Sequence, residues 1–193
     1  MILIAVTFSP TPSQALSETD SLFYSGVKLP QNYQTAFVHY ATVQRSDGTS
    51  RNIYINPEAI EAIKAGNRLL PEHTVIVIEG FYARKDSDDT YLLDNNGRYE
   101  NGDAFEMLHV LEKRFDWSDS DFVSENRIGD WNFGSFNTAN GDFFDENMSA
   151  CFHCHNATEH TDFLYSAPLL RNFIQTGQTQ FLLCDLPDRI ACS

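Results

Sequence analysis

The chain has 193 residues and a formal net charge of −14, from 27 acidic and 13 basic side chains. This length suits one domain with a sizeable core, and the acidic surface disfavours nucleic acid and anionic lipid headgroups as partners. A cationic partner would suit such a surface, although a solvated acidic surface is the simpler interpretation. No apolar run approaches the length of a membrane span. We therefore expect a single domain over residues 31–193.

Residues 1–30 are expected to form a leader and linker. Residues 1–6 are apolar and 13–15 resemble a small-residue cleavage site, yet no Lys or Arg precedes Lys28. We interpret the segment as the remainder of a truncated secretory signal, and the alternative is a short disordered leader. The first interpretation predicts a periplasmic or otherwise extracytoplasmic location.

The order of the expected elements favours an α+β fold. Runs of β-branched and aromatic residues predict strands at 37–43, 52–55, 74–82, 107–113 and 130–136. Helices are expected after Asn56-Pro57, around the cysteines near the C-terminus, and from Ser166 to Ile174. The polar segment 86–103 predicts an exposed hairpin or long loop. We expect an antiparallel, β-rich sheet with helices on one side.

The most specific motif is Cys151-Phe152-His153-Cys154-His155. Cys-x-x-Cys-His is the attachment signature of a c-type haem, in which the two thiols add to haem vinyl groups and the adjacent imidazole binds iron. We therefore predict one haem c, covalently attached through Cys151 and Cys154, with His155 as the axial ligand. The haem is expected between the sheet and the C-terminal helical segment.

Two other interpretations of the cysteines remain open. A thioredoxin-like pair needs a preceding buried strand and a low-pKa thiol, whereas residues 145–150 resemble the first turns of a helix. A zinc site could use all four cysteines, but seven residues separate Cys184 from Cys192, and structural zinc prefers short-spaced pairs. If haem occupies the first two cysteines, an oxidising compartment would permit a Cys184–Cys192 disulfide.

Several segments, taken in order, resemble the cytochrome P-460 and cytochrome c′-beta family. They cover most of residues 30–175, namely Tyr33, 37–43, 54–59, 74–79, 112–113, 131–133 and the Cys-Phe-His-Cys-His motif. The resemblance implies a β-rich, usually dimeric fold with one five-coordinate c-haem. It also implies that His155 is the proximal ligand.

The two branches of this family carry out different chemistry. The P-460 branch oxidises hydroxylamine, with a lysine cross-linked to the haem edge and a distal Glu that moves protons. The c′-beta branch has apolar distal residues and binds nitric oxide. The family pattern places Ile78 at the cross-linking position, and a slip of one residue gives Val77 or Glu79. The resemblance therefore implies a haem-contacting Ile78 and no lysine cross-link.

His109 takes the position of the family's distal Glu when the strand is aligned on Lys113. It shares a strand face with Met107 and Leu111, which is unusual for a solvent-facing histidine. His109 is therefore a candidate catalytic residue that stabilises a ligand, donates a proton or closes the iron site. The alternative is a core histidine with satisfied hydrogen bonds.

Glu79 lies within the apolar strand and has two interpretations. It could be a pocket acid with a raised pKa. The preferred interpretation is a residue near a strand end that pairs with Arg84 or Lys85.

Together these residues predict an extracytoplasmic mono-haem c protein that binds or transforms a small nitrogen ligand. If it transforms that ligand, it is an oxidoreductase. Nitric oxide is the first candidate and hydroxylamine the second, at an iron site open opposite His155. The alternative is a six-coordinate electron-transfer cytochrome in which His109 or Met107 fills that site. A homodimer and an unidentified redox partner protein complete the expectation.

Overall fold

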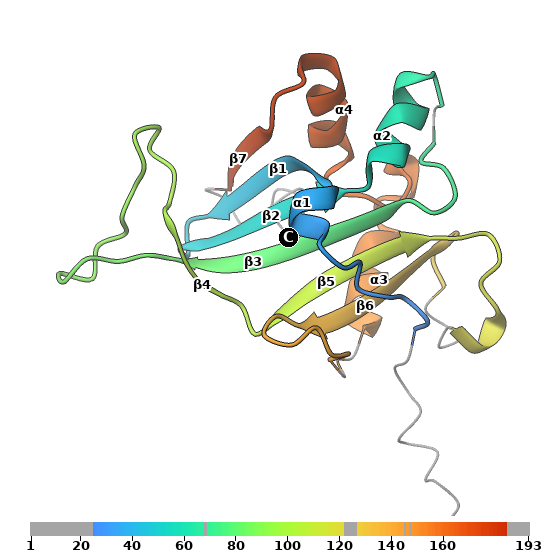
Figure 1. The fold of residues 1–193 in the computed structure, drawn as a ribbon, viewed down its shortest axis with the longest axis horizontal. Helices are drawn as coiled ribbons and strands as arrows, with labels where there is room; N and C mark the ends of the chain where they lie inside the picture. Colours follow the sequence, from blue (N-terminus) through green and yellow to red (C-terminus); the bar gives the residue numbers. More distant parts are fainter. Residues whose placement is uncertain (1–24, 68, 122–126, 145, 147, 185–193) are drawn as a thin grey trace, which may run out of the picture.

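The computed structural model describes residues 25–67, 69–121, 127–144, 146 and 148–184. One seven-stranded sheet dominates it, with the order β6-β5-β3-β2-β1-β7 and with β4 paired to β3 (Figure 1). The strands are β1 (Val38–Arg45), β2 (Thr49–Ile55), β3 (Val75–Ala83), β4 (Asn101–Ala104), β5 (Met107–Lys113), β6 (Trp131–Asn137) and β7 (Gln180–Cys184). The expected sheet-rich α+β class is confirmed.

The sheet differs from the expected antiparallel one at a single edge. All pairs among β1 to β6 are antiparallel, but β7 runs parallel to β1. A parallel neighbour needs a crossover connection. Here that connection is the whole stretch of chain from β2 to α4 (Ala167–Thr176), and α4 packs against both β1 and β7. The run that forms β7 is short and mostly half-buried, so its sequence carries only a weak strand signal.

The remaining helices are α1 (Tyr33–Ala36), α2 (Pro57–Lys64) and α3 (Ser149–Asn156), with 3-10 turns at Asp119–Asp121 and Glu159–Thr161. Helices α2, α3 and α4 lie where the sequence predicts them, and the short helix α1 was not predicted. Gly177 ends α4 in the left-handed conformation, with φ 68°, as expected of a glycine after a helix.

Asn56 precedes α2 as expected, but its side chain does not cap the helix. Its Oδ1 accepts a hydrogen bond from Val75 N at 2.8 Å, and its Nδ2 donates to the His73 carbonyl at 3.2 Å. The Asn56 amide therefore connects the start of α2 to the turn before β3. It forms hydrogen bonds with backbone groups of that turn and of β3 instead of capping the N–H groups of its own helix.

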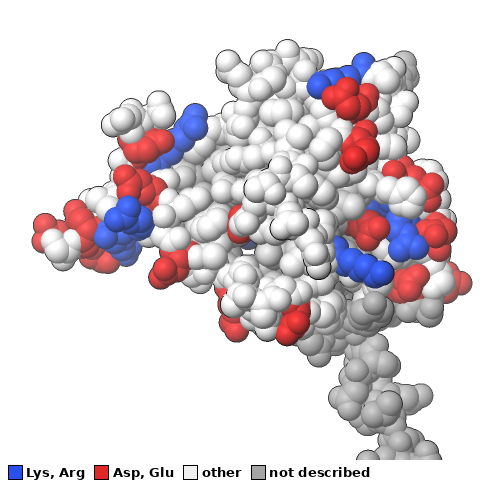
Figure 2. Space-filling view, viewed as in Figure 1, with Lys and Arg blue, Asp and Glu red and all other residues white. Residues whose placement is uncertain are grey.

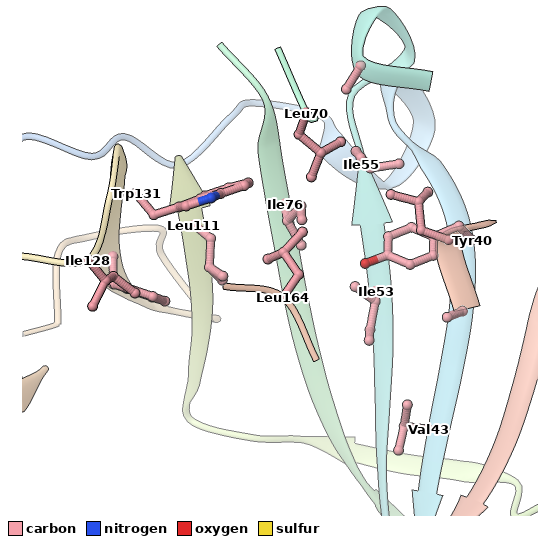
Figure 3. Packing of buried hydrophobic residues seen from close by; sticks show 14 of the residues in the cluster. Tyr40, Val43, Ile53, Ile55, Leu70, Ile76, Leu111, Ile128, Trp131 and Leu164 are labelled. Carbon is pink, nitrogen blue, oxygen red and sulfur yellow. The ribbon is translucent and has the colours of Figure 1, made fainter. Parts of the chain in front are cut away.

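Side chains from the two faces of the sheet form two separate cores. We call the first the α3 face, and it packs against α3, α4 and the segment after α3. Figure 3 shows its side chains, which include Tyr40, Ile55, Ile76, Leu111, Trp131 and Leu164. We call the second the α1 face, and it includes Tyr33, Tyr54, Val77, Val110 and Phe136. Helix α1 lies in front of the sheet in Figure 1 and α3 lies behind it.

Strand register brings particular side chains together on the α3 face. Ile78 of β3 is the Cα partner of Ile53 on β2 and of His109 on β5. His109 in turn is the partner of Ser135 on β6. The two candidate site residues Ile78 and His109, which come from separate segments of the sequence, therefore lie side by side on adjacent strands.

The polar segment after β3 forms the exposed hairpin that its sequence predicts. A bridge joins Leu93 to Tyr99, and Gly97 takes φ 75° at the turn between them. Figure 2 shows charged side chains gathered at this hairpin and around the opposite end, while the middle of that face is largely uncharged. Within the described part of the chain, no helix is long and apolar enough to cross a membrane.

Two predictions concern residues outside the described ranges. Residues 1–24, interpreted as the remainder of a signal, lie outside them, and so does Cys192. Cys184 is buried at the end of β7, and its pairing with Cys192 stays a prediction. Within the segment predicted as a linker, Val27 packs on the α1 face with 3% of its surface exposed.

Candidate functional site

The three residues of the cysteine motif lie on one short helix, α3. Positions 151, 154 and 155 are three and four residues apart, so their side chains share one face of the helix. Cys151 and Cys154 are unbridged and half-buried. The His155 ring meets Phe133 of β6 edge-on, with ring centroids 5.0 Å apart. The motif therefore faces the sheet, as attachment to a haem buried there requires.

The second nitrogen of His155 is held by the backbone. His155 Nδ1 lies 2.6 Å from the carbonyl oxygen of Phe163, so Nδ1–H donates to that carbonyl and Nε2 is left for a metal. Burial lowers the pKa of His155, which favours the neutral imidazole that binds iron. Both the orientation and the protonation of this ring suit an axial ligand.

A cavity lies between the α3 face and the segment from His155 to Leu169. Its empty volume is about 590 Å³, a figure that includes open solvent at the mouth. Apolar side chains from four strands and the opposite segment form much of its wall, among them Val43, Ile53, Ile76, Ile78, Leu111 and Leu164. The predicted position of the haem, between sheet and C-terminal helical segment, coincides with this cavity.

Two arginines, Arg45 of β1 and Arg51 of β2, line the same cavity. Arg45 Nε is buried and has no hydrogen-bond partner within the described part of the chain. Burial and the neighbouring Arg45 charge lower the pKa of Arg51. A buried donor without an acceptor costs about 1–3 kcal/mol, and the two carboxylates that a haem carries are the acceptors that guanidinium groups prefer. This observation shows that the cavity fits a haem.

The thiols do not have the environment of a redox pair. Burial, with a smaller contribution from the Glu146 charge, raises the pKa of Cys151 to about 11, whereas reactive thiols have lowered pKa values. Among the described residues, no group of three or more His, Cys, Asp or Glu side chains is placed to bind a metal ion. The thioredoxin-like and zinc interpretations both lose support.

Ile78 lies in the cavity wall together with His155. None of the described residues lining the cavity is a lysine. Lys85 Nζ is 2.8 Å from Asp89 in the exposed hairpin, and Lys113 Nζ is 2.7 Å from Asp162. Neither lysine lies in the wall beside Ile78.

His109 lies beside Ile78 but does not line the cavity. Its Nε2 is 3.1 Å from a carboxylate oxygen of Glu146, which also accepts a hydrogen bond from Ser135 Oγ at 2.7 Å. The sequence analysis did not single out Glu146. An acid shortly before the motif carries no signal by itself, because only the pairing of β5 with β6 brings His109, Ser135 and Glu146 together.

The preferred interpretation of Glu79 was wrong. Its side chain is buried on the α1 face, where a carboxylate oxygen accepts hydrogen bonds from Tyr33 Oη at 2.9 Å and Gln34 Nε2 at 2.8 Å. Arg84 pairs instead with Glu100. Because side chains alternate along a strand, Glu79 points away from Ile78 and from the cavity.

A search of curated proteins found no match to this chain. A family model described as cytochrome P460 matches residues 30–166, well over half of the chain. This match spans the strands that build the cavity and the helix that carries Cys151, Cys154 and His155. The chain therefore belongs to the cytochrome P460 family and is a mono-haem cytochrome.

Proposed function

We propose that this protein is an extracytoplasmic haem c protein that binds a small nitrogen ligand, nitric oxide first, at an open axial site. Cys151 and Cys154 would attach the haem, His155 would hold the iron, and Arg45 and Arg51 would pair with the propionates. When bound, the haem would supply an iron that His155 holds and that can bind a small ligand. The protein's own residues then decide which molecules reach the iron.

The observation that carries this proposal is the apolar wall of the cavity. Ile76, Ile78 and Leu111 present only hydrocarbon to it. Transfer of a charged ligand from water into such surroundings is costly unless the charge is paired, so a neutral diatomic molecule is favoured over an anion. This argument ranks nitric oxide above charged nitrogen compounds.

Hydroxylamine remains the second candidate, with a narrower role. Ile78 has no amine with which to form a cross-link, so we do not expect the lysine-linked haem of the P-460 branch. If hydroxylamine is oxidised, His109 is the candidate proton donor because Glu146 lies within hydrogen-bond distance of its ring. The same contact occupies His109 Nε2, which supports an iron site that His109 does not close.

The test is the visible spectrum of the holoprotein made with the cytochrome c maturation machinery. We expect a high-spin ferrous spectrum that changes on addition of nitric oxide or carbon monoxide. A low-spin spectrum that ignores both gases would instead support the electron-transfer alternative. His109→Leu and Met107→Leu identify the blocking residue in that case, since the responsible substitution would open the site.

Haem attachment has a separate test. Intact mass should equal the polypeptide plus one haem, and Cys151→Ala with Cys154→Ala should remove the haem stain from a denaturing gel. Peptide mapping should find no haem bonded to Lys85 or Lys113. A lysine-bonded haem would contradict the placement of Ile78 at the cross-linking position.

Location and assembly are also part of the proposal. The apolar N-terminal residues and the haem c motif support export to the periplasm, and family resemblance supports a homodimer. Cell fractionation of the native protein and light scattering of the purified protein check these two points. A cytoplasmic monomer would contradict both.

A further inference from the structure

A nearly buried ion pair lies behind the proximal side of the cavity. Lys113 Nζ is 2.9 and 2.7 Å from the two carboxylate oxygens of Asp162. The two side chains are only 4% and 16% exposed. Removing two charges from water costs several kcal/mol, so a buried pair is by itself weak evidence of stabilisation. The position of the pair therefore matters more than its strength.

Asp162 belongs to an unusual stretch of backbone. Asp162 and Phe163 are consecutive non-glycine residues in the left-handed conformation, with φ of 55° and 61°. Each such residue costs of order 1–3 kcal/mol and persists only where its surroundings impose it. The Phe163 ring packs against Gly129, where an added Cβ would come within 2.6 Å of it. Backbone hydrogen bonds to residues 158–161 also hold this stretch. The Lys113–Asp162 pair is a further restraint, and it anchors the stretch to β5.

The strained stretch supplies the hydrogen-bond acceptor for the haem ligand. The carbonyl of Phe163, immediately after Asp162, is the group that lies 2.6 Å from His155 Nδ1. The direction of this carbonyl depends on the backbone angles at Asp162 and Phe163. Acceptors on the second nitrogen of a metal-bound imidazole set its orientation and its basicity.

We propose that Lys113 and Asp162 are positioning residues for the proximal ligand, and that their ion pair fixes the Phe163 carbonyl against His155 Nδ1. The pair thereby sets the electron-donor strength of the imidazole and the reduction potential of the iron. This inference rests on ligation by His155 in the proposed function. It assigns a role to a lysine that lies outside the cavity and outside the motif.

The test compares Lys113→Met and Asp162→Asn with the wild-type holoprotein. Without the pair the carbonyl is released, so we expect the Nδ1–H proton of His155 to exchange with solvent at least tenfold faster, by NMR. A less basic imidazole stabilises ferric iron less, so the midpoint potential should rise. Lys113→Arg, which keeps the cation, should restore both values towards wild type. The double variant should differ little from either single one, since the residues act as a unit.

Lys85→Met is the matched control, because it breaks an ion pair with Asp89 in the exposed hairpin. It should leave exchange and potential unchanged. A purely structural role would lower the melting temperature of the Lys113 and Asp162 variants without moving either readout, and that result would overturn the inference. Asp162→Asn preserves shape and is the variant to measure if Lys113→Met fails to fold.

Failure of the underlying proposal gives a different result. In the ferric wild type, a His155 Nδ1–H without a paramagnetic shift would refute ligation by His155. A shifted proton whose exchange is the same in all variants would refute the role of the ion pair alone. Neither readout depends on whether the sixth position is open.

Discussion

The charged side chains Glu79 and Arg45 lie on opposite faces of the sheet and differ in their hydrogen bonding. On the α1 face, Glu79 accepts hydrogen bonds from Tyr33 and Gln34, and burial with the Glu79 charge raises the pKa of Tyr33. On the α3 face, Arg45 Nε is buried without a hydrogen-bond partner among the described residues. Because Arg45 lines the cavity, a ligand bound there could complete its hydrogen bonding.

Two histidines also lie on opposite faces of the sheet and differ in what they face. Burial lowers the pKa of both His39 and His155. His39 packs on Tyr54 on the α1 face, and its Nε2 contacts the Ala41 carbonyl oxygen and Thr42 Oγ1, both at 3.0 Å. His155 Nδ1 contacts the Phe163 carbonyl oxygen, and His155 lines the cavity. A lowered pKa therefore does not separate the two residues, but their position does, because His39 is not among the residues that line the cavity.

The largest expected effect comes from replacing His155 with alanine, and the same replacement of His39 is its control. His155→Ala should abolish the normal haem spectrum and its response to nitric oxide, because the axial ligand is lost. His39→Ala should leave both unchanged and cost about 1–2 kcal/mol of unfolding free energy for its hydrogen bonds. Absorption spectra and urea unfolding check the pair, and a loss of spectrum in the His39 variant would erase the contrast between the faces.

The next effect is on stability and belongs to the α1 face. Glu79→Leu leaves the Tyr33 hydroxyl and the Gln34 amide without their acceptor, so we expect a loss of about 2–3 kcal/mol of unfolding free energy. Glu79→Gln keeps one acceptor oxygen and should cost less. Urea unfolding measures both, with the haem spectrum as the readout that should not move. A spectral change would place Glu79 in the functional site.

Arg45→Met should change the unfolding free energy in opposite directions in the protein without haem and in the holoprotein. Without haem it removes a buried unpaired donor, so the unfolding free energy should be unchanged or higher by about 1–2 kcal/mol. With haem it removes a propionate partner and should lower stability relative to the wild-type holoprotein. Unfolding of both forms tests this, and equal destabilisation of the two would show that Arg45 has a structural partner.

The smallest expected effect is a pH dependence of the chain without haem. Burial raises the pKa of Cys151 in the folded state to about 11, above the ordinary thiol value of 9.0, so the unfolded state ionises first as pH rises. Stability from the neutral thiol is present below pH 9 and is lost between about pH 9 and 11. The loss should be about 1 kcal/mol after allowance for solvent screening.

Cys151→Ser should flatten this slope in urea unfolding between pH 8 and 11. The holoprotein should also lack it, because a thioether does not ionise. A slope that persists in Cys151→Ser would assign the effect to other groups, such as Tyr165, whose pKa burial raises to about 12.

Local patterns predicted the elements well, and distant contacts were predicted poorly. The strand over 107–113 matches β5 residue for residue, and the Asn56-Pro57 pair does begin α2. Asn56 nevertheless uses its side chain for His73 and Val75. Strand β7 escaped prediction because its pairing partner, β1, lies far away in the sequence.

The sequence by itself determined the cofactor signature and the identity of its ligand, because Cys151, Cys154 and His155 are held together by one turn of helix. It also determined that Ile78 carries no amine. Only the tertiary structure decided that Arg45 lines the same cavity as His155, that Glu146 meets His109 and that Lys113 reaches Asp162. Those contacts join residues tens of positions apart, and they depend on strand register and on the packing of the C-terminal segment, which no local pattern encodes.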